Sequence, residues 1–325
     1  GMEGSDAGGY PPTKPFRARF SRQGDSVNSV VWFTGKPVSN YALKGYAKFT
    51  RDYETRTPMI YLGANDGMLH GFSAADGTEK IAYVPKGVSP SLSQLTDPGY
   101  NNSHKFFVDG SPMTGDVDMG AGVQDPDDPN YNPAYTPGWR TVLVGTLGRG
   151  GKGYFVLDVT NPNASNDANG ALGFTAGNAL DLVKLDRSRG AGEPTPDCVT
   201  GLNSAQQTAC NNAWTEDKDI GHITAQPVLD DTNPMRTTQI TRMNDNRWAV
   251  VLGNGYNSTN QRPVLLIQYL DGAMELKRIV AAPNDAPGTG NAADNGLAAP
   301  RLMDLNGDGR PDVAYAGDNL GNMWK

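Results

Sequence analysis

Hydrophobic residues in this chain come in short runs that end in glycine and are followed by a polar turn and a second hydrophobic run. The pattern occurs four times, with first runs at residues 59–63, 141–145, 248–253 and 312–317. Their partner runs are residues 68–72, 154–159, 264–269 and 322–324. Short apolar runs bounded by turn residues are typical of β-strands. The pattern therefore predicts four β-hairpins, with the first strand of each buried on both faces.

The turns support the hairpins. Asn65, Asp66 and Gly67 separate the first pair of runs, and such residues adopt the positive φ angles that a tight hairpin needs. Two hairpins would make a four-stranded blade, and radial blades leave few exposed edges. The hairpins are irregularly spaced, which predicts long inserted loops rather than a bare repeat of about 40–45 residues. The predicted fold is all-β, a β-propeller with long inserted loops.

Two insertions look like surface loops, at residues 112–138 and 164–214. The first contains the polar segment 125–130, which has almost no apolar residues. Short helices are expected only around residues 91–96 and 205–214. Residues 27–33, within the segment 24–41, are expected to form a further strand.

Composition agrees with many short strands joined by turns. The 325 residues include 40 glycines and 23 prolines, and 37% are hydrophobic, below the usual share of about 45–50%. The net charge of −7, without a local Lys/Arg cluster, argues against a nucleic-acid partner. The apolar runs are far shorter than the ~18 residues of a membrane span, so none is expected.

The domain organisation is expected to be simple. Residues 1–16 look like a tail or cloning remnant, and residues 17–325 are expected to form a single propeller domain. The last residues stop inside a predicted strand at Trp324. We therefore expect the chain to be the C-terminal part of a larger protein, with its own end truncated.

Two cysteines, Cys198 and Cys210, lie in a polar segment rather than in an apolar run. This placement favours a disulfide and an oxidising compartment. Closing a loop of this length would stabilise the fold by roughly 3 kcal/mol. Two free surface thiols are the alternative.

The sharpest local signal is a calcium-type loop at residues 304–312. Oxygen-bearing side chains fall at its alternate early positions and at its ninth position, and these are Asp304, Asn306, Asp308 and Asp312. Gly309 stands where such a loop turns sharply, and Arg310 would offer its backbone carbonyl. Calcium binds six to eight oxygens, so this donor set suits it. A solvated acidic turn is the alternative.

This loop is not an EF-hand. Tyr315 stands where an EF-hand has its bidentate glutamate, and a strand rather than a helix follows. The predicted site is therefore a shorter loop in a blade turn, closed by Asp312. Calcium there could clamp the last blade or act as a sensor that changes partner contacts.

Other chemistry is weakly supported. Residues 148–153 match Gly-x-Gly-x-x-Gly, but a strand is expected to follow instead of the helix that binds a pyrophosphate. None of the three histidines has zinc-type spacing, and no Gly-x-Ser-x-Gly elbow occurs. The acid pairs Asp116/Asp118 and Asp230/Asp231 could be glycosidase carboxylates, although such pairs are more often turn residues or caps. We predict no catalytic site, no organic cofactor and no enzyme.

A series of motifs resembles the PilY/PilC-type proteins of type IV pili, over residues 24–325. In chain order these are YLGANDGMLHGF at 61–72, AYVP at 82–85, HKFFVDGSP at 104–112, GGKGYFVLDVT at 150–160, AQPV at 225–228, GNGYNS at 253–258, DLNGDGRPD at 304–312 and YAGD at 315–318. The order of these motifs is more specific than any one of them.

The resemblance implies a modified quinoprotein-like propeller of about seven blades, the C-terminal domain of a pilus biogenesis factor and tip adhesin. It implies export through the periplasm and outer membrane to the pilus tip, contacts with pilins or minor pilins and with host cells, and roles in virulence and twitching motility. Calcium, held by the five residues of the loop, would oppose pilus retraction. No Arg-Gly-Asp tripeptide is present, so integrin-type adhesion is not expected.

Two other functions remain open at this point. A quinoprotein-like dehydrogenase has blades rich in similar turns, but it needs a central quinone pocket with calcium beside the quinone. A carbohydrate-binding propeller is the second alternative.

Overall fold

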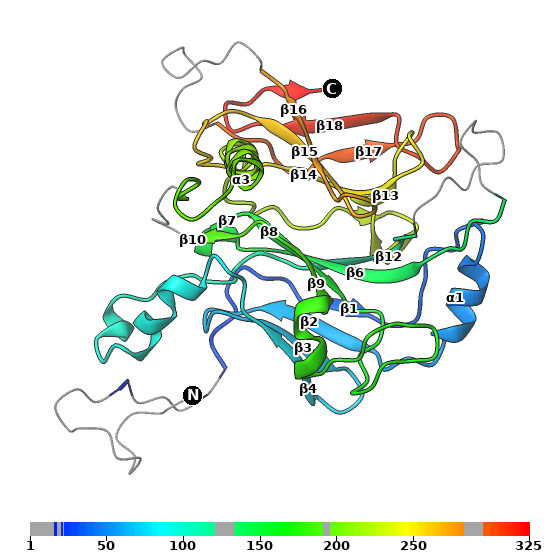
Figure 1. Cartoon of the computed structure of the whole chain (residues 1–325), viewed down its shortest axis with the longest axis horizontal. Helices are drawn as coiled ribbons and strands as arrows, with labels where there is room; N and C mark the ends of the chain where they lie inside the picture. The colour runs from blue at the N-terminus through cyan, green and yellow to red at the C-terminus, as the bar shows by residue number, and fades with distance from the viewer. Residues whose placement is uncertain (1–15, 18–20, 22, 121–132, 191–195, 283–294) are drawn as a thin grey trace.

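The computed structural model describes residues 16–17, 21, 23–120, 133–190, 196–282 and 295–325 (Figure 1). The expected tail at residues 1–16 lies outside these ranges except for Phe16, and so does the polar segment 125–130. Among the described helices, none has the length and apolar character needed to cross a membrane.

Most of the described strands belong to three four-stranded antiparallel sheets and one three-stranded sheet. The first sheet contains β1 (Trp32–Thr34), β2 (Met59–Gly63), β3 (Leu69–Ser73) and β4 (Glu79–Tyr83). The second contains β5 (Met113–Asp118), β6 (Trp139–Thr146), β8 (Tyr154–Asp158) and β9 (Val183–Asp186). The third contains β13 (Ile240–Arg242), β14 (Trp248–Gly253), β15 (Val264–Tyr269) and β16 (Leu276–Val280). The fourth contains β17 (Arg301–Met303), β18 (Val313–Gly317) and β19 (Met323–Trp324).

Smaller elements connect these sheets. Two short ladders pair β7 (Gly151–Lys152) with β10 (Arg189–Gly190) and β11 (Leu229–Asp230) with β12 (Asn233–Thr237). The α-helices are α1 (Tyr46–Asp52), α2 (Ala179–Leu182) and α3 (Ser204–Asp217). The 3-10 helices are η1 (Ser89–Thr96), η2 (Tyr100–Asn102), η3 (Gly148–Gly150) and η4 (Ala176–Asn178).

The four predicted hairpins are confirmed as the pairs β2–β3, β6–β8, β14–β15 and β18–β19. The assignment of two hairpins to each blade is wrong, because each hairpin belongs to a sheet of its own. The hydrophobic pattern did not predict the flanking strands of these sheets because they are short or partly exposed, as in β17. The described residues thus form four blades, so the count of about seven is not reached within them.

Burial of the first strand differs from hairpin to hairpin. Strands β6 and β14 are buried along almost their whole length, as predicted. Strand β2 instead alternates between buried and half-buried residues, and most of β18 is half-buried. The difference follows from position, because β6 and β14 lie in sheets that have other sheets on both sides, whereas β2 and β18 lie in the first and fourth sheets.

The interpretation of residues 112–138 as a surface loop is wrong at its start, where β5 forms an edge strand of the second sheet. The strand was missed because its sequence contains Asp116 and Asp118. Both carboxylates are buried and accept hydrogen bonds from hydroxyl groups, including those of Tyr46 and Tyr135. Burial of a carboxylate is tolerated when such donors are supplied.

The insertion at residues 164–214 is also more ordered than expected, because it contains α2, β9 and β10. The helix predicted at residues 205–214 is confirmed as α3, and the one predicted at 91–96 is the 3-10 helix η1. Asn203 and Gln206 form a capping box that begins α3. The strand expected at residues 27–33 is present only as the three-residue β1.

The hydrophobic core lies between neighbouring sheets, which follow one another from the first at the bottom of Figure 1 to the third and fourth at the top. One cluster joins the first and second sheets through side chains such as Tyr61 and Phe155. A larger one joins the second and third sheets, where Trp139 contacts Trp248 edge to face with ring centroids 5.5 Å apart. Propeller blades bury their apolar surface in this way, by packing the face of one sheet against the face of the next.

Candidate functional site

The predicted calcium loop connects β17 to β18 in the fourth sheet. All five predicted ligands, Asp304, Asn306, Asp308, Arg310 and Asp312, lie in this connection. Arg310 is half-buried and the other four residues are exposed. The loop is therefore held at the surface between two strands, as the sequence indicated.

Asp304 organises the first half of this loop. Its two carboxylate oxygens accept hydrogen bonds from the backbone N–H groups of Gly307 and Gly309, both at 2.7 Å. The bond from Gly309 and the other backbone N–H groups lower the pKa of Asp304 below its usual range. Gly307 and Gly309 have φ angles of +80° and +81°, which only glycine adopts without strain.

The remaining acidic and amide side chains fold the second half. Asn306 accepts a hydrogen bond from the N–H of Asp308 at 2.9 Å, and Asp308 accepts one from the N–H of Arg310 at 2.9 Å. Asp312 closes the loop by accepting from the N–H of Leu305 at 2.8 Å. The side chains that would bind calcium therefore also determine the shape of the loop.

The donor set fits calcium better than the present side-chain positions do. Carboxylate, amide and carbonyl oxygens are the ligands that this hard cation prefers. However, no three His, Cys, Asp or Glu side chains in the described ranges are close enough together to hold a metal ion. The side chains of Asp304, Asp308 and Asp312 are likewise not close enough together. An ion would have to draw these carboxylates towards one centre, away from some of their backbone partners.

The loop touches the neighbouring blade. The side chain of Asn244, in the turn between β13 and β14, donates a hydrogen bond to the carbonyl of Pro311 at 3.1 Å. Pro311 directly precedes Asp312, the residue that closes the loop. A change in loop shape would therefore reach the third sheet through a direct contact.

The two acid pairs have structural partners. Asp116 accepts hydrogen bonds from Ser39, Tyr46 and Thr141, and Asp118 accepts from the backbone N–H groups of residues 120 and 138. Asp230 accepts from Thr232 and pairs with Arg236 at 3.2 Å, whereas Asp231 pairs with the exposed Arg301 at 3.0 Å. Asp230 and Asp231 thus fit the interpretation as turn residues, whereas Asp116 and Asp118 are buried strand residues of β5.

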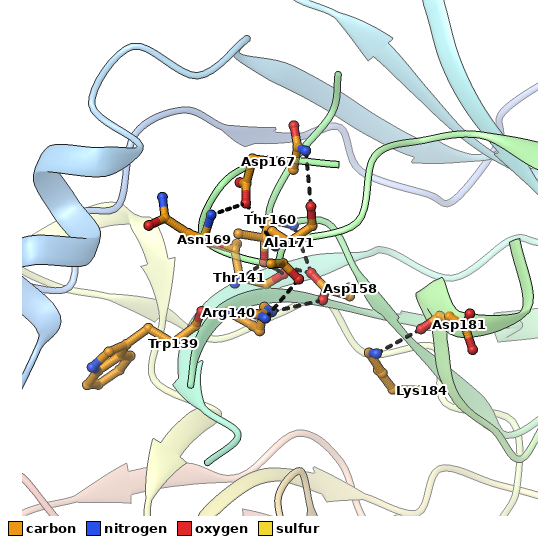
Figure 2. A network of polar contacts seen from close by, with 12 residues as sticks. Trp139, Arg140, Thr141, Asp158, Thr160, Asp167, Asn169, Ala171, Asp181 and Lys184 are labelled. Carbon is orange, nitrogen blue, oxygen red and sulfur yellow. Dashed lines mark hydrogen bonds and ion pairs between the residues drawn. The ribbon is translucent and has the colours of Figure 1, made fainter. Parts of the chain in front are cut away.

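A polar network that includes Thr141, a hydrogen-bond partner of Asp116, ties β6 to β8 (Figure 2). Asp158 accepts hydrogen bonds from the N–H and the hydroxyl of Thr160, at 3.0 and 2.6 Å, and lies 3.5 Å from Arg140. The hydroxyl of Thr160 accepts from the N–H of Thr141 at 2.9 Å. Thr141 therefore belongs both to this network and to the group around Asp116.

The glycine run at residues 148–153 has a packing role. Strand β8 follows it, as predicted, rather than a helix. A Cβ atom on Gly150 would lie 1.8 Å from the carbonyl oxygen of Phe107, and Gly153 has a φ angle of +97°. The glycines thus allow the backbone to approach neighbouring segments closely.

The predicted disulfide is confirmed between Cys198 and Cys210, whose Cα atoms lie 5.5 Å apart. It joins the segment before α3 to the first half of that helix. The other end of α3 is held by Arg187, which pairs with Glu216 at 2.8 Å and with Asp217 at 3.0 Å. A helix without buried residues is thus linked to the segment before it by the disulfide and to Arg187 at its C-terminal end.

One hollow was missed entirely by reasoning from sequence. A cavity of about 410 Å³ lies between the first sheet, the second sheet and β12, with Arg56 and Asp116 in its wall. Its lining comes from segments far apart in the chain, so no local motif could indicate it.

The comparisons with known proteins agree with this architecture. The model of a family described as the PilY1 beta-propeller domain matches residues 23–186 and 217–325. The unmatched segment between the two parts holds Cys198, Cys210 and nearly all of α3. The disulfide-linked helix is therefore an addition to the part that the family model describes.

Curated relatives are named as pilus biogenesis factors. The type IV pilus biogenesis factor PilY1 of Pseudomonas aeruginosa strain PAO1 is 35% identical over 321 residues, which cover 95% of this chain and 21% of that protein. A PilY1 homolog of Xylella fastidiosa is 32% identical over 329 residues, covering 96% of this chain and 18% of that protein. The chain thus spans about a fifth of the length of these relatives.

A solved structure gives the same result. The crystal structure of the Pseudomonas aeruginosa PilY1 C-terminal domain matches with a TM-score of 0.54 and 29% identity, covering 90% of this chain and 44% of that one. Together with the family match and the blade-like sheets, this likeness confirms the predicted fold and the predicted resemblance. The chain belongs to the PilY1 β-propeller domain family.

Proposed function

We propose that this chain is a non-enzymatic domain of a type IV pilus biogenesis factor that works at the cell surface, at the pilus tip. The observation that carries the proposal is the family match over both parts of the chain, residues 23–186 and 217–325. The names of the relatives, all type IV pilus biogenesis factors, support it. Pilins or minor pilins are the proposed partners, and host-cell adhesion is a further proposed role.

The disulfide supports a location outside the cytoplasm. Bonds of this kind form and persist in oxidising compartments such as the periplasm and the cell surface. The bridge between Cys198 and Cys210 therefore fits a protein exported through the periplasm and the outer membrane. The acidic net charge of −7 suits protein partners rather than nucleic acid.

Calcium control is the second part of the proposal. Bound calcium would be held by the side chains of Asp304, Asn306, Asp308 and Asp312 and by the carbonyl of Arg310. The ion would offset the repulsion between three neighbouring carboxylates. Because the side chain of Asn244 bonds to Pro311, the ordered loop would also fix its contact with the third sheet. We propose that this ordering favours pilus extension over retraction.

Calcium is expected to raise the melting temperature of the domain, and Asp308→Ala should abolish the rise. At 100 times its dissociation constant, a ligand that binds only the folded state adds roughly 2.7 kcal/mol to stability. Differential scanning calorimetry with and without calcium measures the effect. The matched control is Asp181→Ala, which changes an exposed aspartate outside the loop. Equal shifts in the wild type and Asp308→Ala would refute the assignment of this loop.

The pilus role is tested in the full-length protein, in cells that lack the natural copy. Restoring the wild type should restore surface pili and twitching, whereas a copy without this domain should not. Asp308→Ala should give few surface pili, and their number should recover when retraction is disabled genetically. Full piliation without the domain would contradict the proposed function. Normal piliation and twitching with Asp308→Ala would contradict only its calcium control.

A further inference from the structure

The cavity beside β1 and β5 differs from the calcium loop in its chemistry. It is lined by apolar side chains from three separate segments, among them Phe33, Pro58 and Met235. Phe33 is 41% exposed and Met235 is 48% exposed, so the cavity opens to solvent along an apolar border. Its volume of about 410 Å³ is within the range of small-ligand sites.

Arg56 provides a fixed positive charge in this apolar wall. Its Nε donates to the carbonyl of Gly35 at 2.6 Å, and its Nη1 donates to the hydroxyl of Thr141 at 2.7 Å. Nη1 also reaches the carbonyl of Thr160 at 3.4 Å, the residue of the network in Figure 2. Among the residues that the structure describes, no carboxylate lies within ion-pair distance of Arg56, and no hydrogen-bond acceptor contacts its Nη2.

The carboxylate of Asp116, on the same cavity wall, does not form an ion pair with Arg56. Asp116 accepts hydrogen bonds from three hydroxyl groups, and Thr141 stands between it and Arg56. Burial lowers the pKa of Arg56, although the charge of Asp116 opposes this effect. A cation that is poorly solvated and has a free N–H edge is favourably placed to receive an anion.

Two further cations line the cavity. Lys36 is exposed at its border, and Arg236 has a buried Nε without a hydrogen-bond partner, although its other nitrogens contact Ser39 and Asp230. The opposing charges in the lining are Glu54 and the hydrogen-bonded Asp116. Cations therefore outnumber anions in this wall, in a chain that is acidic as a whole.

We propose that this cavity is a binding site for a carboxylate that is joined directly to an apolar group. The carboxylate would bind the Nη2 edge of Arg56, and the apolar group would contact Phe33, Pro58 and Met235. A guanidinium suits this anion because its planar N–H donors match the two carboxylate oxygens. Both a small organic acid and the C-terminal end of a peptide carry such a group. This binding activity is separate from the pilus role and from calcium.

Isothermal titration calorimetry on the intact chain tests the proposal with two matched pairs of probes. N-acetyl-L-phenylalanine is compared with its amide, and the peptide acetyl-Gly-Gly-Gly-Phe is compared with its C-terminal amide. Both acids should bind saturably, and each amide should bind at least about tenfold more weakly, because it lacks the charge that pairs with Arg56. Similar affinity of the two acids would indicate small molecules as the source, and tighter binding of the peptide would indicate a chain end.

Variants locate the site. Arg56→Gln should lose most of the affinity for both acids, and Lys36→Gln should weaken it a few fold by removing an exposed charge. Lys80→Gln, an exposed lysine on β4, is the control and should bind as the wild type does. If Arg56→Gln does not fold, Lys36→Gln and the comparison of acids with amides still test the proposed site. Absence of saturable binding by the acids, or equal affinity for acids and amides, would overturn the proposal.

Discussion

Replacement of Asp219 by alanine is expected to lower the free energy of unfolding by about 3 kcal/mol. Asp219 has no solvent-exposed surface. Its carboxylate pairs with Arg262 through two hydrogen bonds of 2.8 and 2.9 Å and with Arg278 at 2.6 Å, and it accepts a further bond from Asn260 at 2.8 Å. Removing it leaves two guanidinium groups without their anion. The value is at the low end for a broken buried ion pair, because both arginines still reach water.

Equilibrium unfolding in urea measures this loss. The matched control is Asp231→Ala, which breaks an aspartate–arginine pair of similar geometry at the surface, with Arg301. The side chain of Asp231 is 81% exposed, so its removal should change stability by less than about 1 kcal/mol. If the two variants lose the same stability, burial of the Asp219 cluster does not strengthen its contribution to the fold.

Lowering the pH should reproduce part of the stability loss expected from Asp219→Ala. Burial alone would raise the pKa of Asp219, but the hydrogen bonds from Arg262 and Asn260 outweigh it and lower the pKa below its usual value. The carboxylate therefore contributes stability that is present above the unfolded-state pKa of about 3.9 and is lost as the pH falls through the lower folded-state pKa. The stability difference between wild type and Asp219→Ala should accordingly shrink in strong acid.

Gly150→Ala is expected to destabilise the fold by about 3 kcal/mol or more. Its Cβ would lie 1.8 Å from the carbonyl oxygen of Phe107 and 2.3 Å from the carbonyl carbon. Both atoms belong to the backbone, so no side chain can move aside. The segment before β5 or the turn before β8 would have to shift, and the core between the first and second sheets would loosen. Thermal and urea unfolding measure the effect.

Gly177→Ala is the matched control for this substitution. Gly177 lies in a 3-10 helix, and a Cβ there would meet only the side chain of Thr175, at 3.9 Å. Its replacement should change stability by less than about 1 kcal/mol. A Gly150→Ala protein as stable as Gly177→Ala would show that the backbone contact with Phe107 is looser than described.

Local signals in the sequence were the most dependable. The four hairpins, helix α3 and the disulfide follow from apolar runs, turn residues and a polar setting for two cysteines, all of which act over short distances. The same is true of the β17–β18 loop, where Gly307 and Gly309 take the left-handed backbone that an acidic turn needs. The blade assignment failed because flanking strands such as β5 carry buried aspartates that look like loop residues.

The sequence by itself determined which segments pair as neighbours along the chain, and it determined which oxygen-bearing residues occupy the loop at residues 304–312. Only the tertiary structure decided which sheet each hairpin joins, because that depends on short strands whose partners are distant. It also decided the roles of Asp116 and Asp219, whose hydrogen-bond donors come from elsewhere in the chain. The cavity around Arg56 arises in the same way, since its walls exist only after the blades have packed. Contacts between residues far apart in the chain produce no periodic pattern in the sequence. For that reason only the folded structure shows them.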